Sequence, residues 1–337
     1  MGRSLTYIIP AYNCESCIVT CLDSIFALPI GDGLEVIVVD DCSTDSTLAV
    51  LKEYASHHSN MVVLEQPYNQ RQGAARNRGI RAASGEYIAF CDADDTIVVE
   101  GVMNALKAVS DTEADICYFD FEYEQPRGCW KTFTMPSQTV DTLMLSEEYL
   151  EHYYTCWYNA PWRNLYRRVF LQSANLRFEE GIRWEDCDWT VKVYAQARQI
   201  QFVGGIGYRY AQNANSTCCQ PPTPQAMAEQ LLAGLRLLLF ADEIRQRLPN
   251  LSKTLSEEAQ SRYVGVLRFH NLSKYSMLSV ARIYSFLGSE SRKRLAEYHF
   301  NQWIDFVLNH KVLVLSAWLL VHPATNLMRL FVSKVKN

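Results

Sequence analysis

Hydrophobic and polar positions along the first 125 residues alternate between two periods. Short apolar runs rich in β-branched and aromatic residues predict strands at Leu5 to Pro10, Leu34 to Val39, Met61 to Leu64, Tyr87 to Cys91 and Ile116 to Phe121. Helical periodicity lies between these runs, at residues 15–25, 44–57, 74–83 and 98–109. Strands joined by crossovers of this length form right-handed βαβ units, so the pattern predicts an α/β domain with a mostly parallel sheet flanked by helices.

The pattern changes after Gln125. An aromatic-rich stretch follows, then a predicted helix from Glu185 to Ala197 and a predicted strand from Gln201 to Gly204. The segment from Gln212 to Pro224 contains three prolines and is typical of a mobile loop or linker. Helical patterns at 225–248, 254–268 and 279–309 then predict a helical C-terminal third. We therefore expect a domain over residues 1–220 and a helical extension over residues 221–337.

Charge is distributed unevenly along the chain. The net charge is −5, but residues 292–337 contain seven Lys and Arg and two acidic residues, so this tail is +5 and the rest is −10. An acidic body argues against nucleic acid as a partner, whereas the tail is a candidate for an anionic partner or an ordinary solvated helix face. With 48% hydrophobic and 20% charged residues, the chain has the composition of a globular protein.

The end of the tail is amphipathic. The apolar run from Val312 to Val321 is ten residues long, whereas a spanning helix needs roughly 20. From Ala324 to Val335, apolar and polar side chains fall on different helix faces, as in an interfacial helix or a helix packed on the body. Peripheral membrane contact through residues 311–337 is therefore one of two open interpretations.

The cysteines and the N-terminus bear on location. Eleven cysteines are an odd number, and residues 1–12 lack the features of a signal peptide. Cys14, Cys17 and Cys21 have no second Cys or His pair at zinc-finger spacing, which favours buried thiols over a zinc site. We therefore expect a cytoplasmic protein with free thiols, peripheral at the inner face of the cell membrane if the tail binds lipid.

Polar residues follow three of the predicted strands. Ligands of open parallel sheets bind beyond the carboxyl ends of the strands. These ends carry Pro10-Ala11-Tyr12-Asn13, Asp40-Asp41-Cys42-Ser43-Thr44-Asp45 and Asp92-Ala93-Asp94-Asp95. For Asp45 the preferred interpretation is a helix cap. Three carboxylates within four residues repel one another unless a cation lies among them, and oxygen ligands without His suit Mg²⁺ or Mn²⁺. The third strand end therefore predicts a metal site for a phosphate-bearing ligand.

Nucleotide-binding motifs of the P-loop and Rossmann types are missing. A helix opens instead with Gly73-Ala74-Ala75-Arg76-Asn77. Arg76, in its first turn, is placed to reach a base or a phosphate, or to form an ordinary salt bridge.

Together these segments resemble the family-2 glycosyltransferases, which have the GT-A fold. The resemblance rests on four pieces, in order: Ile8-Ile9-Pro10-Ala11-Tyr12-Asn13, Val38-Val39-Asp40-Asp41-Cys42-Ser43-Thr44-Asp45, Gly73 through Gly79, and Asp92-Ala93-Asp94-Asp95. It extends through Trp162, Leu165-Tyr166-Arg167-Arg168 and Trp184-Glu185-Asp186 to about residue 217. It implies a nucleotide-binding half over residues 1–100 and an acceptor half over residues 125–217.

The resemblance also implies roles for individual residues. The nucleotide-sugar site would comprise Pro10, Ala11, Tyr12, Glu15, Asp40, Asp41, Arg76, Asp92, Ala93 and Asp95. Asp40 or Asp41 would hold the base edge, and Asp92 would lie near the ribose. Asp94, with Asp92, would hold a Mn²⁺ or Mg²⁺ ion that bridges the diphosphate, and Asp95 would face the donor sugar or support the metal site.

The catalytic base implied by the resemblance is Asp186. An inverting transfer needs a carboxylate to take the proton of the acceptor hydroxyl as its oxygen attacks the anomeric carbon. Asp188 is the competing assignment, and a third interpretation is that Glu185 and Asp186 only favour a helix N-terminus. The aromatic residues between 130 and 166 would lie on the acceptor side, as core residues or as faces on which sugars stack.

Two departures from the family pattern stand out. Cys42 occupies a position that is commonly Gly in Asp-Asp-Gly-Ser, which tightens the requirements of that turn. The segment from Tyr208 to Thr217 contains no His, an extra metal ligand in some members, so a cation or Arg209 would complete the diphosphate clamp.

The activity implied is an inverting, metal-dependent transfer of a hexosyl or N-acetylhexosaminyl group. The donor would be a nucleoside-diphosphate sugar, a UDP-sugar in the first place, and the acceptor a hydroxyl of a glycan or lipid-linked molecule in bacterial surface polysaccharide biosynthesis. Two alternatives are a catalytically silent nucleotide- or glycan-binding protein and a nucleotidyltransferase that makes sugar nucleotides. The second lacks its Gly-rich opening loop after Leu5 to Pro10.

Overall fold

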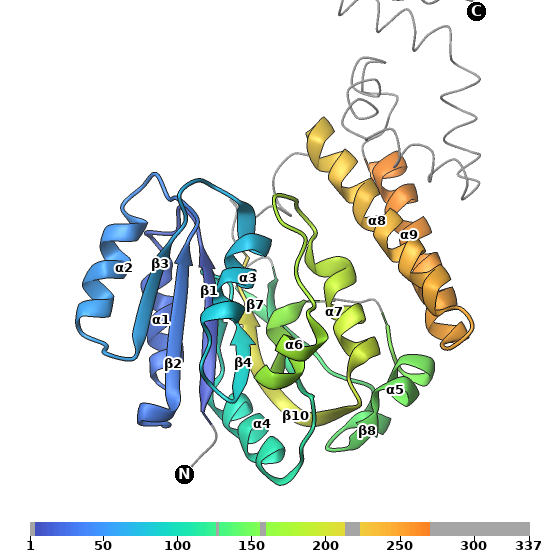
Figure 1. The fold of residues 1–337 in the computed structure, drawn as a ribbon, viewed down its shortest axis with the longest axis horizontal. Coiled ribbons are helices and arrows are strands. Elements are labelled where there is room, and N and C mark those ends of the chain that lie inside the picture. The colour runs from blue at the N-terminus through green and yellow to red at the C-terminus, as the bar shows by residue number, and fades with distance from the viewer. Residues whose placement is uncertain (1–3, 126–127, 156–159, 213–222, 270–337) are drawn as a thin grey trace, which may run out of the picture. The chain divides into compact units, whose positions relative to one another are not determined.

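A computed structural model describes residues 4–125, 128–155, 160–212 and 223–269 (Figure 1). The chain divides into two compact units, one of Met1–Gln220 with Ile244–Thr254 and one of Pro221–Glu243 with Leu255–Asn337. The first unit holds every residue for which a site role is predicted. The predicted helix at 279–309 and the segments Val312 to Val321 and Ala324 to Val335 lie outside the described residues, as does most of the predicted loop from Gln212 to Pro224.

One mixed sheet forms the centre of the first unit. Within the described residues it has ten strands, in the order β3-β2-β1-β4-β9-β6-β10-β5, with β7 paired to β6 and β8 to β10. The strands are β1 (Leu5–Ala11), β2 (Leu34–Asp40), β3 (Met61–Glu65), β4 (Tyr87–Phe90), β5 (Thr96–Ile97), β6 (Ile116–Gln125), β7 (Cys129–Phe133), β8 (Leu143–Leu145), β9 (Asn164–Arg167) and β10 (Gln199–Tyr210). The predicted α/β fold with a central sheet is confirmed, and β1 to β4 pair in parallel as expected.

Helices lie between the strands and beside the sheet (Figure 1). In the first unit they are α1 (Ile18–Phe26), α2 (Thr47–Ser56), α3 (Arg71–Ala82), α4 (Val99–Asp111), α5 (Ser146–His152), α6 (Arg168–Ala174) and α7 (Asp186–Gln196). Two further helices follow in the chain and belong mostly to the second unit, α8 (Pro224–Ile244) and α9 (Pro249–Phe269). The N-cap of α2 is Ser46, and Asp45 before it supports the start of the helix, because its Oδ1 accepts a hydrogen bond from the backbone N–H of Thr47 at 3.0 Å. The helix predicted from residue 74 begins earlier, at Arg71.

Four short strands, β5, β7, β8 and β9, were not predicted from the sequence, and β10 is longer than predicted. β9 runs antiparallel to both neighbours, β4 and β6, and so divides the parallel part of the sheet. β10 continues well beyond Gly204, where the predicted strand ends. Its pairing with β6 shifts register between Val203 and Ile206 and again between Ile206 and Tyr208. The glycines permit these bulges, since Gly205 has φ +110° and a Cβ on Gly207 would lie 2.5 Å from the Phe119 ring.

An aromatic core fixes α7 against the sheet. Trp189 of α7 stacks on Phe178 with ring centroids 3.9 Å apart and an interplanar angle of 16°. Phe90 of β4 meets both rings edge-on, with centroids 5.9 Å and 5.7 Å away. Trp189 also packs against Tyr166 of β9. These buried contacts hold the first turn of α7 in a set position relative to the carboxyl end of β4.

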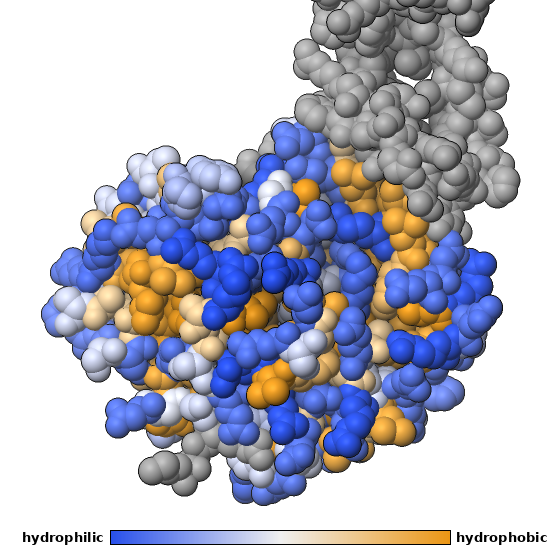
Figure 2. All heavy atoms as spheres, in the orientation of Figure 1, coloured by the Kyte–Doolittle hydropathy of each residue, from blue (hydrophilic) through white to orange (hydrophobic). Residues whose placement is uncertain are grey.

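Among the apolar surface visible in Figure 2 are a patch over β3 in the first unit and a stretch along α8 and α9. Val62 of the edge strand β3 is 44% exposed, and Leu239 of α8 is 38% exposed. Among the described helices, α8 and α9 included, none combines the length and the apolar character needed to cross a bilayer. The predicted membrane contact of residues 311–337 lies outside the described residues.

Candidate functional site

The three polar strand ends meet at one edge of the sheet. β1 lies between β2 and β4 and runs parallel to both, so their carboxyl ends are neighbours. Asn13 joins the first two ends: its Oδ1 accepts a hydrogen bond from the Thr44 N–H at 2.8 Å, and its own N–H donates to Ser43 Oγ at 3.1 Å. This edge is where α/β sheets bind ligands.

Asp40 and Asp41 differ in their surroundings although both are buried. Asp41 Oδ1 accepts hydrogen bonds from the Gln70 N–H at 2.7 Å and from Gln66 Nε2 at 3.0 Å. Burial nevertheless raises the pKa of Asp41. Asp40 Oδ2 accepts from the Ser43 N–H at 3.2 Å, while no donor among the described residues reaches its buried Oδ1. A buried acceptor in this state suits a ligand donor such as the N–H of a base.

Cys42 adopts a left-handed backbone conformation with φ +63°. A β-carbon crowds the backbone there, which explains why a related turn would carry Gly. Cys42 therefore occupies the turn after Asp41 at a cost in local strain.

Glu15, Tyr12, Pro10 and Ala11 lie at the end of β1. Glu15 Oε2 accepts a hydrogen bond from the Ser46 N–H at 2.7 Å, so it helps to hold the start of α2. Tyr12 is 48% exposed, Pro10 is half-buried and Ala11 is buried. Tyr12 is thus the member of this group with a large face open to a ligand, and the predicted roles of all four stay predictions.

Arg76 is a buried cation that joins the two halves of the site. Its guanidinium, 2% exposed, donates to Asp92 Oδ1 at 2.6 Å and to Glu185 Oε1. Burial works against the charge, but the attraction of Asp92, Glu185 and Asp186 outweighs it and raises the pKa of Arg76. The salt-bridge interpretation of Arg76 therefore describes its protein contacts, and its contact with a base or phosphate stays a prediction.

The segment before α7 is held tightly against α3. Trp184 has φ +62°, an uncommon conformation for a bulky residue, and Glu185 is buried. Gly73 of α3 makes the approach possible, because a Cβ there would lie 2.4 Å from the Glu179 carbonyl oxygen and 3.1 Å from Glu185 Cγ. The packing of Glu185 against α3 was not predicted from the sequence, although the residue lies inside the Trp184-Glu185-Asp186 motif.

Asp186 and Asp188 differ in their position on α7. Asp186 is the first residue of the helix and is half-buried, and its charge acts on Arg76. Asp188 is buried, and its Oδ2 accepts from Lys192 Nζ at 2.7 Å, one turn along the helix. The geometry therefore favours Asp186 over Asp188 as the carboxylate that faces the strand ends.

The Asp92-Ala93-Asp94-Asp95 segment contains one buried and two half-buried carboxylates. Asp95 Oδ2 accepts from the Tyr208 hydroxyl at 2.6 Å, and its Oδ1 accepts from the Ala211 N–H at 2.8 Å. Burial, followed by the charge of Asp92, raises the pKa of Asp95. Tyr208 in turn stacks on Trp162, with ring centroids 4.2 Å apart. Sequence reasoning missed Tyr208, which anchors Asp95 to β10. Ala93 is buried beside it.

The donor set at this segment fits a hard divalent cation. Asp92 keeps 24% of its side chain exposed despite the ion pair with Arg76, and Asp94 is half-buried. Among the described residues, no group of three or more His, Cys, Asp or Glu side chains is arranged to hold a metal. Two carboxylate oxygens suit Mg²⁺ or Mn²⁺ when substrate phosphates complete the coordination. The metal assignment of Asp94 and Asp92 stays a prediction on this donor chemistry.

Comparisons with known proteins agree with this geometry. The family model described as "Glycosyl transferase family 2" matches residues 6–173. EpsJ of Bacillus subtilis (strain 168), described as an uncharacterized glycosyltransferase, is 31% identical over 233 residues, which are 67% of this chain and 66% of EpsJ. YibD of Escherichia coli (strain K12), described in the same way, is 27% identical over 212 residues, 62% of this chain and 61% of YibD. The chain thus spans between three fifths and two thirds of these relatives.

Solved structures share the fold. The crystal structure of Staphylococcus aureus TarS 1–349 in complex with UDP-GlcNAc matches with a TM-score of 0.65 and 22% identity, over 84% of this chain and 79% of that one. A mannosyltransferase of Pyrobaculum calidifontis in complex with GDP-Man and Mn²⁺ matches with a TM-score of 0.52 and 17% identity, over 97% of this chain and 87% of that one.

Proposed function

Because the chain belongs to glycosyltransferase family 2, we propose that it transfers a sugar from a nucleoside-diphosphate sugar to a hydroxyl of a glycan or lipid-linked acceptor. The favoured donor is a UDP-sugar, and the favoured setting is polysaccharide biosynthesis. TarS, which shares the fold, is crystallised with UDP-GlcNAc, and a relative named for succinoglycan biosynthesis is 29% identical over 186 residues. Both support the proposal without fixing the sugar or the acceptor.

The observation that carries the proposal is the Arg76 bridge. One guanidinium contacts Asp92 at the end of β4 and Glu185, the residue before Asp186. The bridge therefore holds a helix-start carboxylate beside the strand ends where a diphosphate would bind. A transferase needs a carboxylate close to the diphosphate site, because the acceptor oxygen must attack the anomeric carbon next to the leaving diphosphate.

In the proposed reaction Asp186 accepts the proton of the acceptor hydroxyl as its oxygen attacks the anomeric carbon. The nucleoside diphosphate leaves from the opposite face of the sugar, so the configuration inverts. On the donor side, the buried Asp40 Oδ1 would accept from the base, and Tyr12 would offer its exposed ring. Arg76 positions Asp92 and the start of α7 rather than meeting the reacting atoms.

Asp94 and Asp92 are proposed to hold Mn²⁺ or Mg²⁺. When bound, the ion would neutralise charge on the diphosphate of the donor. The Mn²⁺ named in the Pyrobaculum calidifontis structure supports this choice. Asp95 would support the metal-binding segment from behind, through its hydrogen bonds to Tyr208 and the Ala211 N–H.

Two aspartate variants test the function. A thermal-shift screen of nucleotide sugars with Mn²⁺ first identifies the donor, which stabilises the folded state by binding it. Transfer is then followed as release of the nucleoside diphosphate in the presence of acceptor. Asp186→Asn should lower the rate by about 10²–10⁴-fold while donor binding, measured by calorimetry, persists.

Asp188→Asn is the matched control on the same helix. Because Asp188 is engaged with Lys192, this variant should lose some stability and keep its transfer rate within a few-fold. Full transfer by Asp186→Asn, or loss of transfer confined to Asp188→Asn, would refute the base assignment. A chain that binds no nucleotide sugar would refute the function.

A further inference from the structure

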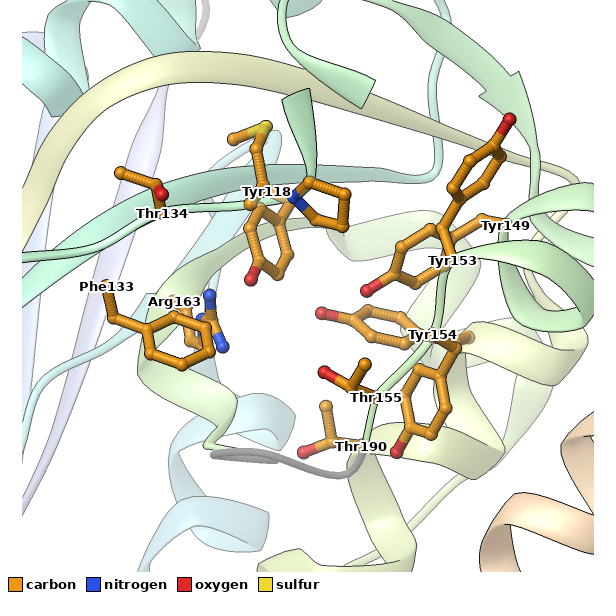
Figure 3. A pocket seen from close by; sticks show the side chains of 12 residues that line it. Tyr118, Phe133, Thr134, Tyr149, Tyr153, Tyr154, Thr155, Arg163 and Thr190 are labelled. Carbon is orange, nitrogen blue, oxygen red and sulfur yellow. The ribbon is translucent and has the colours of Figure 1, made fainter. Parts of the chain in front are cut away.

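A pocket of about 250 Å³ lies in the acceptor half and has no assigned role. Twelve described residues line it, among them five tyrosines, three threonines and Arg163, and none of these twelve is Asp or Glu (Figure 3). They come from β6, the end of β7 and the segment after it, α5 and the residues after it, the turn before β9, and α7. The lining therefore combines aromatic rings with hydroxyl groups around one cation.

Arg163 places a positive charge at the inner wall of the pocket. It is only 3% exposed, and its guanidinium carbon lies 4.3 Å from the ring centroid of Tyr118 and 4.8 Å from that of Phe121. These aromatic faces stabilise the cation and orient it. Burial lowers the pKa of Arg163 to about 10, so the group still carries its charge at neutral pH. In Figure 3 the guanidinium points toward the middle of the pocket, and the Thr155 hydroxyl points there from the other side.

Exposure changes from the mouth of the pocket to its floor. Thr134 and Thr155 are exposed and form the mouth, whereas Thr190 and Tyr194 of α7 are buried. A ligand that enters would pass hydroxyl groups and meet the buried cation. Hydroxyls and a guanidinium are hydrogen-bond donors that suit phosphate and carboxylate oxygens.

The pocket lies on the same helix as the proposed base. Asp186, Thr190 and Tyr194 are spaced by four residues along α7, so they share one face of the helix. Thr190 lies one turn, about 6 Å, beyond Asp186 along the helix axis. A molecule whose hydroxyl reaches Asp186 can therefore extend into the pocket with a neighbouring group.

We propose that this pocket binds an anionic group of the acceptor, a carboxylate or a phosphate, with Arg163 as the charge partner and the tyrosine rings as faces for the sugar. This inference rests on the proposed function, which identifies the molecule that enters the pocket as the acceptor. The pocket selects acceptors that carry negative charge close to the reacting hydroxyl, because a carboxylate or phosphate is attracted to the guanidinium and a neutral group is not.

Matched pairs of small probes test the pocket in the full chain. UDP and Mn²⁺ are kept saturating so that probes do not occupy the donor site, and ionic strength is held constant. Thermal unfolding is followed during titration with glucuronate, with glucose 6-phosphate and with neutral glucose. Saturable stabilisation by glucuronate identifies a carboxylate ligand, and by glucose 6-phosphate a phosphate ligand; glucose should give at least tenfold weaker binding.

Three variants and one control complete the test. Arg163→Met, Tyr118→Phe and Thr190→Val each remove a donor from the pocket, and we expect the first to weaken anion binding roughly ten- to a hundredfold. Thr132→Val changes an exposed threonine of β7 outside the pocket and should bind the anion as the wild type does. If Arg163→Met does not fold, the two hydroxyl variants carry the test.

Equal stabilisation by anionic and neutral probes would overturn the proposal, as would pocket variants that all keep the preference of the wild type. UDP affinity is measured on each protein by calorimetry and should not change. Failure of UDP to bind the wild type would refute the proposed function, whereas failure of the anions with UDP bound would refute the pocket alone.

Discussion

Arg76 in α3 and Glu185 at the start of α7 form a buried ion pair between residues 109 positions apart in the chain. The side chain of Glu185 is fully buried, and its second oxygen accepts a hydrogen bond from Gln72 Nε2 at 3.2 Å. Since Arg76 also holds Asp92, the carboxyl end of β4 and the start of α7 meet at one guanidinium. Activity should therefore depend on a residue that need not touch either substrate.

Arg76→Met tests this dependence. The variant leaves the Glu185 carboxylate buried without its cation, and breaking a buried pair in this way costs about 3–5 kcal/mol. We expect the free energy of unfolding, measured in urea, to fall by that amount. The rate of sugar transfer should fall as well. Arg81→Met changes an exposed arginine of the same helix and should stay within about 0.5 kcal/mol of the wild type. Equal stability of the two variants would contradict the bridging role.

Much of the fold of residues 1–100 follows from local patterns. The strands β1 to β4 are apolar runs between polar turns, and their parallel order is the usual outcome of βαβ units. The strand-end aspartates could be placed at one edge for the same reason. β9 was missed as a strand because Asn164–Arg167 is four residues long and is defined by pairing with β4 and β6, which are distant in the sequence.

The rest of the site depends on contacts that leave no local signal. Tyr208 donates to Asp95 across 113 positions, and Arg76 meets Glu185 across 109. The residues around Glu185 in the sequence do not indicate which cation it pairs with. Likewise, the predicted strand ended at Gly204, whereas β10 continues to Tyr210 and stays paired with β6 through two register shifts. Pairings of this kind are decided by the assembled sheet.

Cys42→Gly should make the chain more stable. Cys42 has a left-handed conformation, which costs a non-glycine residue about 1–2 kcal/mol, and glycine removes this cost. Glycine also has more freedom in the unfolded state, which offsets about 0.5–1 kcal/mol of the gain. We expect a net gain of about 0.5–1 kcal/mol in urea unfolding. Cys129→Gly, in the exposed strand β7, lacks the strain and should lose about 0.5–1 kcal/mol. A loss at both positions would mean that Cys42 is not strained.

Removal of divalent cations should weaken nucleotide binding. Calorimetry of UDP with Mn²⁺ and after treatment with EDTA should show at least a tenfold drop in affinity, since the diphosphate charge then faces Asp92 and Asp94 without compensation. Asp94→Asn should bind UDP with little dependence on Mn²⁺. Asp45→Asn changes a residue that contacts the start of α2, and this variant should keep the full dependence. Unchanged metal dependence in Asp94→Asn would exclude Asp94 from the metal site.

Glu35, near the start of β2, should make the stability of the chain depend on pH. Burial opposes its charge, but the Ser84 N–H at 2.8 Å and the Thr6 hydroxyl at 2.5 Å donate to its Oε2 and lower its pKa. The ionised form therefore stabilises the folded state fully above the unfolded pKa of about 4.3, and this contribution is lost as the pH falls through the lower folded pKa. The stability difference between the wild type and Glu35→Gln should stay constant from about pH 8 to pH 5.5 and shrink below about pH 4.5. Glu53→Gln, at an exposed position of α2, should show a flat difference over the same range. A difference for Glu35→Gln that persists unchanged to about pH 3 would show that these hydrogen bonds do not favour the carboxylate.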